Sequence, residues 1–186
     1  YAHGIHFNDA ELKRLAETGT GVAHCPISNM KLSSGIARIP EMLKLGVRVG
    51  LAVDGSASND GSDLLEELRT GFLLHRLNSS SAAPTGYDML KIATRGSASI
   101  LGRDDIGQIA EGMAADFFLI NMDRLSLTGA QFDVSSMLGT VGYKGNVDYT
   151  VVNGRVVVRE GRLTGVDEEK ITAEANHCVS RYLGRS

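Results

Sequence analysis

The sequence is poor in cysteine: its only two, Cys25 and Cys178, lie far apart along 186 residues. We therefore expect no disulfide framework, and a reducing cytoplasm is the simpler setting. No stretch approaches about 18 consecutive apolar residues, so we expect neither a membrane span nor a membrane partner. Lysine and arginine number 19 against 22 aspartate and glutamate residues, giving a formal net charge of −3. That balance lacks the basic excess of nucleic-acid-binding proteins.

Several catalytic motifs are also missing. No G-x-S-x-G elbow is present, which argues against a serine hydrolase. Neither G-x-x-x-x-G-K-[ST] nor G-x-G-x-x-G occurs, so binding of a nucleotide phosphate has no support. The chain also has no H-x-H pair, a common source of two metal ligands.

Strand and helix signals alternate along the first half of the chain. Asn8 followed by Glu11 predicts a capping box at the start of a helix that ends at Gly19 or Gly21. We expect strand character over residues 1–7, strands over 21–25 and 47–53, a loop over 27–40, and helices over 41–45, 63–77 and 87–98. This alternation indicates an α/β fold with a parallel sheet.

The second half changes character. Residues 105–115 form a glycine-punctuated connector, and strands are expected over 116–120 and 147–152. Asn153-Gly154 predicts a tight hairpin that returns through a strand over 155–159, and a closing helix is expected over 167–183.

Polar side chains follow each of the three strands predicted in the first half. Because functional residues of parallel α/β proteins sit at the carboxyl ends of strands, these residues are the candidates for chemistry. They are His3 and His6 in the first unit, His24, Ser28 and Asn29 in the second, and Asp54, Ser56, Ser58 and Asn59 in the third.

Each candidate also has a structural interpretation. A single histidine near a strand end is more often a hydrogen-bonded structural residue than a catalyst. Asp54-Gly55 is equally typical of a turn, Cys25 of a small buried hydrophobe, and His75 of a packing or surface residue. The coincidence of three strand ends favours function, and a carboxylate beside imidazoles suits a divalent metal that activates water.

Five segments together resemble the amidohydrolase superfamily, in its branch of cytosine, guanine and S-adenosylhomocysteine deaminases. They cover essentially the whole chain, and within the branch they look most like 8-oxoguanine deaminases. The segments are AHGIHF (2–7), HCPISNMKLSSGIARIPEML (24–43), VGLAVDGSASNDGSDLLEELRTGFLLHR (49–76), LGRDDIGQIAEGMAADFFLI (101–120) and VVNGRVVVREGRL (151–163).

The resemblance implies strands six to eight of a metal-dependent (β/α)8 barrel plus part of a small β-sandwich. The corresponding division is 1–112 for the barrel part, 113–165 for the sandwich strands and 166–186 for a terminal helix. The family binds one divalent metal, zinc or iron, and of its ligands only the strand-eight aspartate has a counterpart here, Asp54. The strand-six histidine corresponds to His3, which would orient the attacking water. We therefore expect a fragment of a longer protein, unstable and inactive alone.

The resemblance also implies a function for the intact protein. We expect hydrolytic deamination of an aminated purine-like heterocycle, 8-oxoguanine first, with His3 and Asp54 catalytic and Asp54 also a metal ligand. Ser28 and Asn29 would shape the loop or contact substrate, and His24 would either line the pocket or be structural. An s-triazine amino- or chlorohydrolase is the near alternative, and a catalytically incomplete remnant is the alternative from another class. Family members are commonly dimers or larger, so a homo-oligomer fits.

Overall fold

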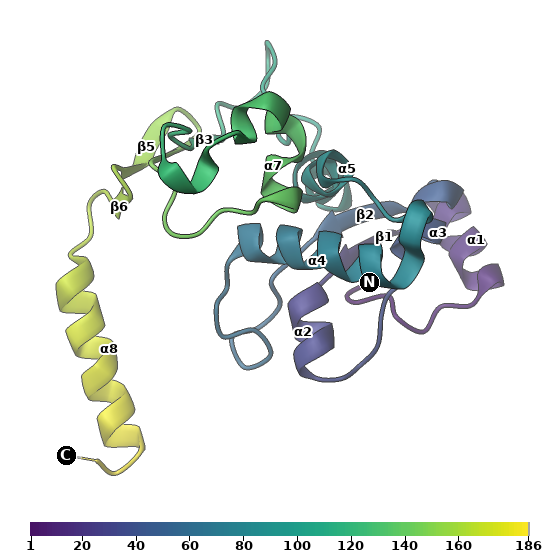
Figure 1. The fold of residues 1–186 in the computed structure, drawn as a ribbon. Helices are drawn as coiled ribbons and strands as arrows, with labels where there is room; N and C mark the ends of the chain where they lie inside the picture. Colours follow the sequence, from purple (N-terminus) through teal and green to yellow (C-terminus); the bar gives the residue numbers. More distant parts are fainter. Residues whose placement is uncertain (186) are drawn as a thin grey trace. The chain divides into compact units, whose positions relative to one another are not determined.

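The computed structural model describes residues 1–185, which form two compact units. Unit 1 comprises residues 1–114 and 122–145, and unit 2 comprises residues 115–121 and 146–186 (Figure 1). The sequence-based division at 112 and 165 stays a prediction about domains. In the structure, residues 122–145 cluster with the α/β part of the chain.

The sheet of unit 1 is parallel, as the alternation of elements predicts. Strand β1 (Gly21–His24) pairs with β2 (Arg48–Leu51) in parallel. The segment over residues 1–3 extends the sheet on the other side of β1 through a parallel bridge from Ala2 to Ala23. The strand character expected over 1–7 is therefore limited to a single bridge. Residues 1–3, β1 and β2 nevertheless run parallel to one another, so their carboxyl ends lie at the same edge of the sheet.

Local signals account for several helices of unit 1. Helix α1 (Asp9–Thr18) has the predicted capping box at Asn8, and Gly19 ends it in the left-handed conformation. Helix α3 (Ile39–Leu45) ends at Gly46 in the same way. Both endings satisfy the last carbonyl groups of a helix at a residue without a Cβ penalty.

The prediction of a loop over residues 27–40 is wrong for its first part. Helix α2 spans Pro26–Lys31, with proline in the first turn. Proline suits this position because the first N–H groups of a helix have no partner within it. Ser28 and Asn29 are buried within this helix.

Helix α4 (Leu64–Ser79) starts at the N-cap Asp63 and packs against α2, β2 and later helices (Figure 1). Leu64 at its start is exposed. Packing against several neighbours selects the stripe made of Glu67, Leu68, Gly71, Leu74 and His75.

The helix expected over 87–98 is one run with a change of pitch. It comprises α5 (Gly86–Lys91), the π-helical segment η2 (Ile92–Gly96) and α6 (Ser97–Ile100), preceded by the short 3₁₀ turn η1 (Ser80–Ala82). At Gly96 a Cβ atom would lie 2.1 Å from the Val49 carbonyl oxygen. The π-helical segment therefore meets β2 through a residue without a side chain.

Residues 122–145 add three short helical elements to unit 1. These are η3 (Leu125–Leu127), η4 (Ala130–Asp133) and α7 (Val134–Thr140), and α7 packs on α4 and α5. The main core residues of this unit include Leu12, Val22, Ile39, Met42, Leu68, Met89, Leu127 and Met137.

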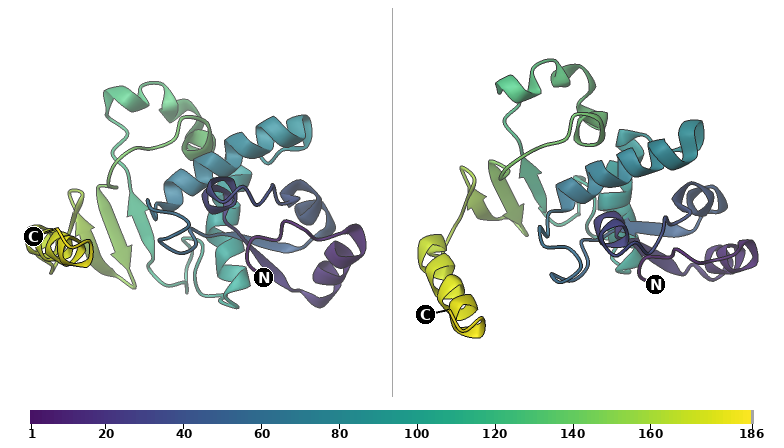
Figure 2. Two further views of the ribbon diagram at one scale, coloured as in Figure 1. Left: turned by 90° about the horizontal axis from the view of Figure 1, so that it is seen from below. Right: turned by 60° about the horizontal axis from the view of Figure 1, so that its bottom comes forward.

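Unit 2 is an antiparallel sheet followed by a helix (Figure 2). Its strands, in spatial order, are β3 (Phe117–Leu119), β4 (Tyr149–Val152), β5 (Arg155–Arg159) and β6 (Arg162–Leu163). The predicted hairpin joins β4 to β5 at Asn153-Gly154, both with positive φ, as a type I′ turn requires. Helix α8 (Glu168–Tyr182) follows its N-cap Asp167 and lies within the closing helix expected over 167–183.

Candidate active site

The carboxyl edge of the unit 1 sheet brings together the first and third predicted strand ends. His3 follows the bridge at Ala2, and Asp54 lies three residues after β2. His3 Nε2 lies 3.9 Å from Asp54 Oδ2, and the side chains are 36% and 29% exposed. Both residues have positive φ, 66° and 69°. Such a conformation is uncommon for residues other than glycine and clusters at functional sites.

Two hydroxyl groups hold the Asp54 carboxylate. Ser28 Oγ donates to Asp54 Oδ2 at 2.5 Å, and Ser58 Oγ donates to the same oxygen at 2.7 Å. These hydrogen bonds, that of Ser28 first, lower the pKa of Asp54 to about 2. Asp54 is therefore ionised at neutral pH, the state in which a carboxylate binds a metal or accepts a proton.

The His3 ring has a partner on its other side. His3 Nδ1 lies 2.9 Å from Oδ1 of Asn29, which is 1% exposed. An amide oxygen only accepts, so this contact is made by the tautomer with the proton on Nδ1. In that tautomer the lone pair of Nε2 faces the Asp54 side.

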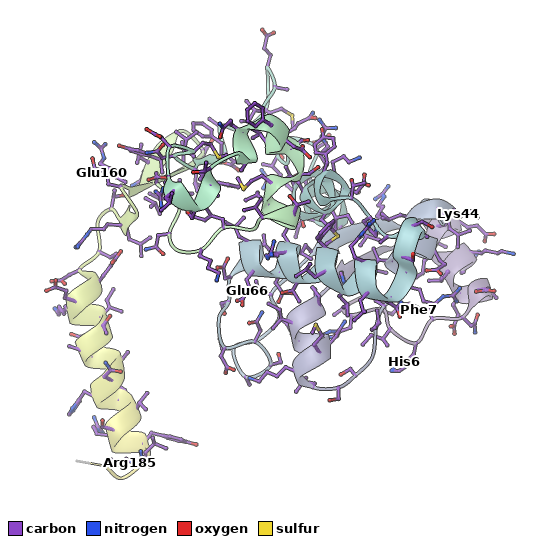
Figure 3. The ribbon with its side chains drawn as sticks, in the orientation of Figure 1. His6, Phe7, Lys44, Glu66, Glu160 and Arg185 are labelled. Carbon is purple, nitrogen blue, oxygen red and sulfur yellow. The ribbon has the colours of Figure 1, made fainter. Side chains whose placement is uncertain are left out.

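A cavity of about 520 Å³ opens over this pair. Its wall is largely the segment before α1, where the His6 side chain projects outward from the ribbon (Figure 3). The lining residues are Ala2, His3, Gly4, Ile5, His6, Phe7, Glu11, Leu32, Ser34, Asp54 and Ser58. The wall thus combines apolar side chains with the two candidate catalytic groups and four other polar residues, as in many small-molecule sites.

Three residues predicted to contact substrate are not part of this lining. His24, Ser28 and Asn29 are all buried, and none of them is among the residues named above as lining the cavity. Their role as substrate contacts remains a prediction. In the structure Ser28 contacts Asp54, and Asn29 contacts His3.

His24 is half of a buried histidine pair. Its Nε2 lies 3.1 Å from His75 Nε2 on α4, and both rings are fully buried. Burial is the main cause that lowers the pKa of His24 to about 3 and that of His75 to about 4. Both rings are therefore neutral at physiological pH and tie β1 to α4.

Cys25 is buried beside this pair. Burial raises the pKa of its thiol to about 11, so the reactive thiolate is scarce at neutral pH. Its environment is that of a small core residue.

Sequence reasoning missed Glu67, a fully buried carboxyl group on α4. Its Oε1 accepts from Asn59 Nδ2 at 2.5 Å, and its Oε2 accepts from the Ile27 backbone N–H at 3.1 Å. Asn59 Nδ2 also donates to the Val53 carbonyl at 2.9 Å. Glu67 therefore links α2 to the loop that carries Asp54. An acidic residue in helical phase with Gly71 and His75 was the available signal.

The residues present supply part of a metal site. Ionised, half-exposed Asp54 fits one ligand of a divalent cation. Among residues 1–185, no group of three or more histidine, cysteine, aspartate or glutamate side chains lies close enough to hold a metal ion. A metal site with three or more such ligands would therefore need side chains from outside this set. Separately, the described helices include none long and apolar enough to cross a membrane.

A parallel α/β unit that gathers a histidine and an ionised carboxylate at one sheet edge has the arrangement from which α/β enzymes build their sites. The comparison with known families agrees and is more specific. The chain belongs to the amidohydrolase family, whose model matches residues 1–157.

Similar proteins act on heterocycles according to their names. The chain is 44% identical over 185 residues to hydroxydechloroatrazine ethylaminohydrolase of Pseudomonas sp. (strain ADP), covering 98% of this chain and 38% of that protein. It is 44% identical over 182 residues to 8-oxoguanine deaminase of Pseudomonas aeruginosa PAO1, covering 98% and 40%. The chain thus spans about two fifths of the length of these relatives.

A solved structure extends the likeness to three dimensions. The atrazine chlorohydrolase of Arthrobacter aurescens TC1, complexed with zinc, superimposes with a TM-score of 0.89 at 35% identity. The match covers 95% of this chain and 39% of that one.

Proposed function

We propose that the protein carrying this chain is a metal-dependent hydrolytic deaminase of an aminated purine-like heterocycle, with 8-oxoguanine as the first substrate to test. The observation that carries the proposal is the pairing of His3 with ionised Asp54 at the mouth of the cavity. The likeness to the 8-oxoguanine deaminase supports the substrate. In this proposal residues 1–3, β1 and β2 correspond to barrel strands six to eight, and β3 to β6 to sandwich strands.

Asp54 would hold the metal, zinc or iron, together with ligands from outside this chain. Zinc in a solved relative supports that metal. When bound, such an ion lowers the pKa of water toward neutrality.

The proposed chemistry assigns separate tasks to the two side chains. Asp54 accepts a proton from the attacking water, and His3 orients that water through Nε2. The water oxygen forms a bond to the ring carbon that bears the amine while the ring C=N double bond opens and its electron pair moves to the ring nitrogen, which makes the carbon tetrahedral. Asp54 then returns the proton to the amine nitrogen, the bond from carbon to that nitrogen breaks, and the pair on the ring nitrogen re-forms the C=N bond as ammonia departs.

An s-triazine substrate is the second candidate. It is favoured by the likeness to the ethylaminohydrolase and to the chlorohydrolase structure. The roles of His3 and Asp54 would not change, because both ring classes present an electrophilic carbon that bears a leaving group.

The test is release of ammonia or alkylamine from 8-oxoguanine, guanine, isoxanthopterin, cytosine and hydroxytriazines. Asp54→Asn should lower kcat at least about a hundredfold and reduce bound metal. Asp60→Asn is the matched control: Asp60 lies on the same loop, its side chain is 79% exposed and it pairs with Lys31. Equal activity of the two variants would refute the role of Asp54. Turnover of triazines alone would replace the purine proposal with the second candidate.

A further inference from the structure

We propose that the consecutive residues Ser28 and Asn29 are the positioning residues of this site, Asn29 fixing the tautomer of His3 and Ser28 fixing the carboxylate of Asp54. This inference rests on the proposed function for its catalytic meaning. Its structural content is independent and can be measured without substrate.

Burial distinguishes a positioning role from substrate contact. Ser28 is 0% exposed and Asn29 is 1% exposed, whereas the two side chains they bind line the cavity. A substrate that occupies the cavity would meet His3 and Asp54 first. Ser28 Oγ lies 2.5 Å from Asp54 Oδ2 and Asn29 Oδ1 lies 2.9 Å from His3 Nδ1, while the buried Nδ2 of Asn29 has no hydrogen-bond partner among the described residues.

Helix α2 holds this pair of residues firmly. The backbone N–H of Asn29 donates to the Cys25 carbonyl, and the Asn29 carbonyl accepts from the N–H of Ser34. At the start of the helix the N–H of Ile27 donates to buried Glu67. The backbone on both sides of Ser28 and Asn29 is therefore anchored, as precise placement of reactive groups requires.

The Asn29 contact determines what His3 can do. With the proton on Nδ1 and donated to Asn29, Nε2 becomes an acceptor. The Asp54 carboxylate, whose Oδ2 lies 3.9 Å away and already accepts from Ser28 and Ser58, is an acceptor group as well. An acceptor nitrogen beside an acceptor carboxylate favours a partner that donates two protons, and the attacking water has two O–H groups. The tautomer thus prepares His3 and Asp54 to receive the same molecule.

The Ser28 contact acts on the other acceptor. Together with Ser58, Ser28 occupies Oδ2 with hydroxyl donors and restricts rotation of the carboxylate. Hydrogen-bond partners that orient a ligand in this way typically affect metal affinity about 10–100-fold.

The decisive measurement is the tautomer of His3, read from its two ring ¹⁵N chemical shifts in the protein labelled with ¹⁵N-histidine. The signals are assigned by their loss in His3→Gln. We expect the Nδ1–H form in the wild-type protein. Asn29→Leu, similar in size but without an acceptor, should lower the ratio of Nδ1–H to Nε2–H about fivefold. Asn29→Asp retains an acceptor oxygen and should retain the Nδ1–H form.

Ser28→Ala tests the proposed contact of Ser28 with the Asp54 carboxylate. Zinc affinity, measured by competition with a chelator, should fall about tenfold. Ser56→Ala, an exposed serine on the loop after Asp54, should leave the affinity unchanged. Loss of affinity in both variants, or in neither, would contradict the role of Ser28.

The tautomer result separates this inference from the proposed function. An Nε2–H form in the wild-type protein overturns the role of Asn29 even if 8-oxoguanine is deaminated and even if Asn29→Leu does not fold. An unchanged tautomer in folded Asn29→Leu overturns it as well. An Nδ1–H form that depends on residue 29, in a protein that deaminates none of the substrates, supports the positioning role while the proposed function fails.

Discussion

The buried pair His24–His75 should make the stability of this protein fall in mild acid. Both rings are fully buried with Nε2 atoms 3.1 Å apart, so there is no room to solvate a charge on either. Burial is the largest effect on both rings; His75 and then His3 lower the pKa of His24 further, whereas Glu41 raises that of His75. The pKa values fall to about 3 for His24 and about 4 for His75.

The sign and size follow from proton binding. The unfolded chain binds a proton at each histidine near pH 6.5, whereas the folded protein does not until far lower pH. The stabilising effect is complete above pH 6.5 and is lost as the pH falls toward 4. Between pH 7.5 and 5.5 each histidine should cost about 1.4 kcal/mol of unfolding free energy, hence about 3 kcal/mol for the pair.

The assay is urea unfolding at pH 7.5, 6.5 and 5.5 for the wild-type protein and for His24→Gln/His75→Gln. The quantity compared is the change in unfolding free energy with pH within each protein. The contributions of titratable groups that both proteins share, and the direct cost of the substitutions, cancel in that comparison. The wild-type protein should lose about 3 kcal/mol more than the variant across this range. Equal pH dependence in the two would refute the argument that burial keeps both rings neutral.

Three other substitutions test the rest of the structure. Burial raises the pKa of Glu67 from 4.5 to about 7, so this group makes wild-type stability fall as the pH rises across that interval, opposite in sign to the effect of the histidine pair. In Glu67→Gln, urea unfolding should show no such fall. Gly96→Ala should lower the unfolding free energy by about 3 kcal/mol, because its Cβ would meet the Val49 carbonyl oxygen, while Gly55→Ala, with no atom nearer than 3.9 Å, should cost under about 1 kcal/mol. Asn8→Ala should cost about 1 kcal/mol through loss of the α1 cap, measured by thermal unfolding, and no change in Tm would contradict the capping box.

Features encoded by neighbouring residues could be predicted from the sequence. The Asn8 cap, the glycine ends of α1 and α3 and the Asn153-Gly154 turn each depend on a few adjacent side chains. The meeting of His3 with Asp54 could be predicted from topology alone, since consecutive parallel strands end at one edge.

Features that depend on distant packing could not be predicted. Residues 26–31 have loop-like composition, yet they form α2 because neighbouring elements cover one side of it. The same packing buries Ser28 and Asn29, so they face His3 and Asp54 rather than the cavity. Which stripe of α4 is buried, with Glu67 and His75 in it, was likewise decided by tertiary contacts.

The order of the chain through the two units has a consequence for synthesis on the ribosome. β3 is made before residues 122–145, but β4, its neighbour in the sheet that residues 1–185 form, is made after them. All described residues of unit 1 have therefore been made when Gly145 has emerged, while β4, the strand that pairs with β3, has not. Unpaired edges recruit other strands. In a nascent chain paused in this interval, the edge of β3 that β4 later covers is open to pairing with a neighbouring chain on the same messenger RNA.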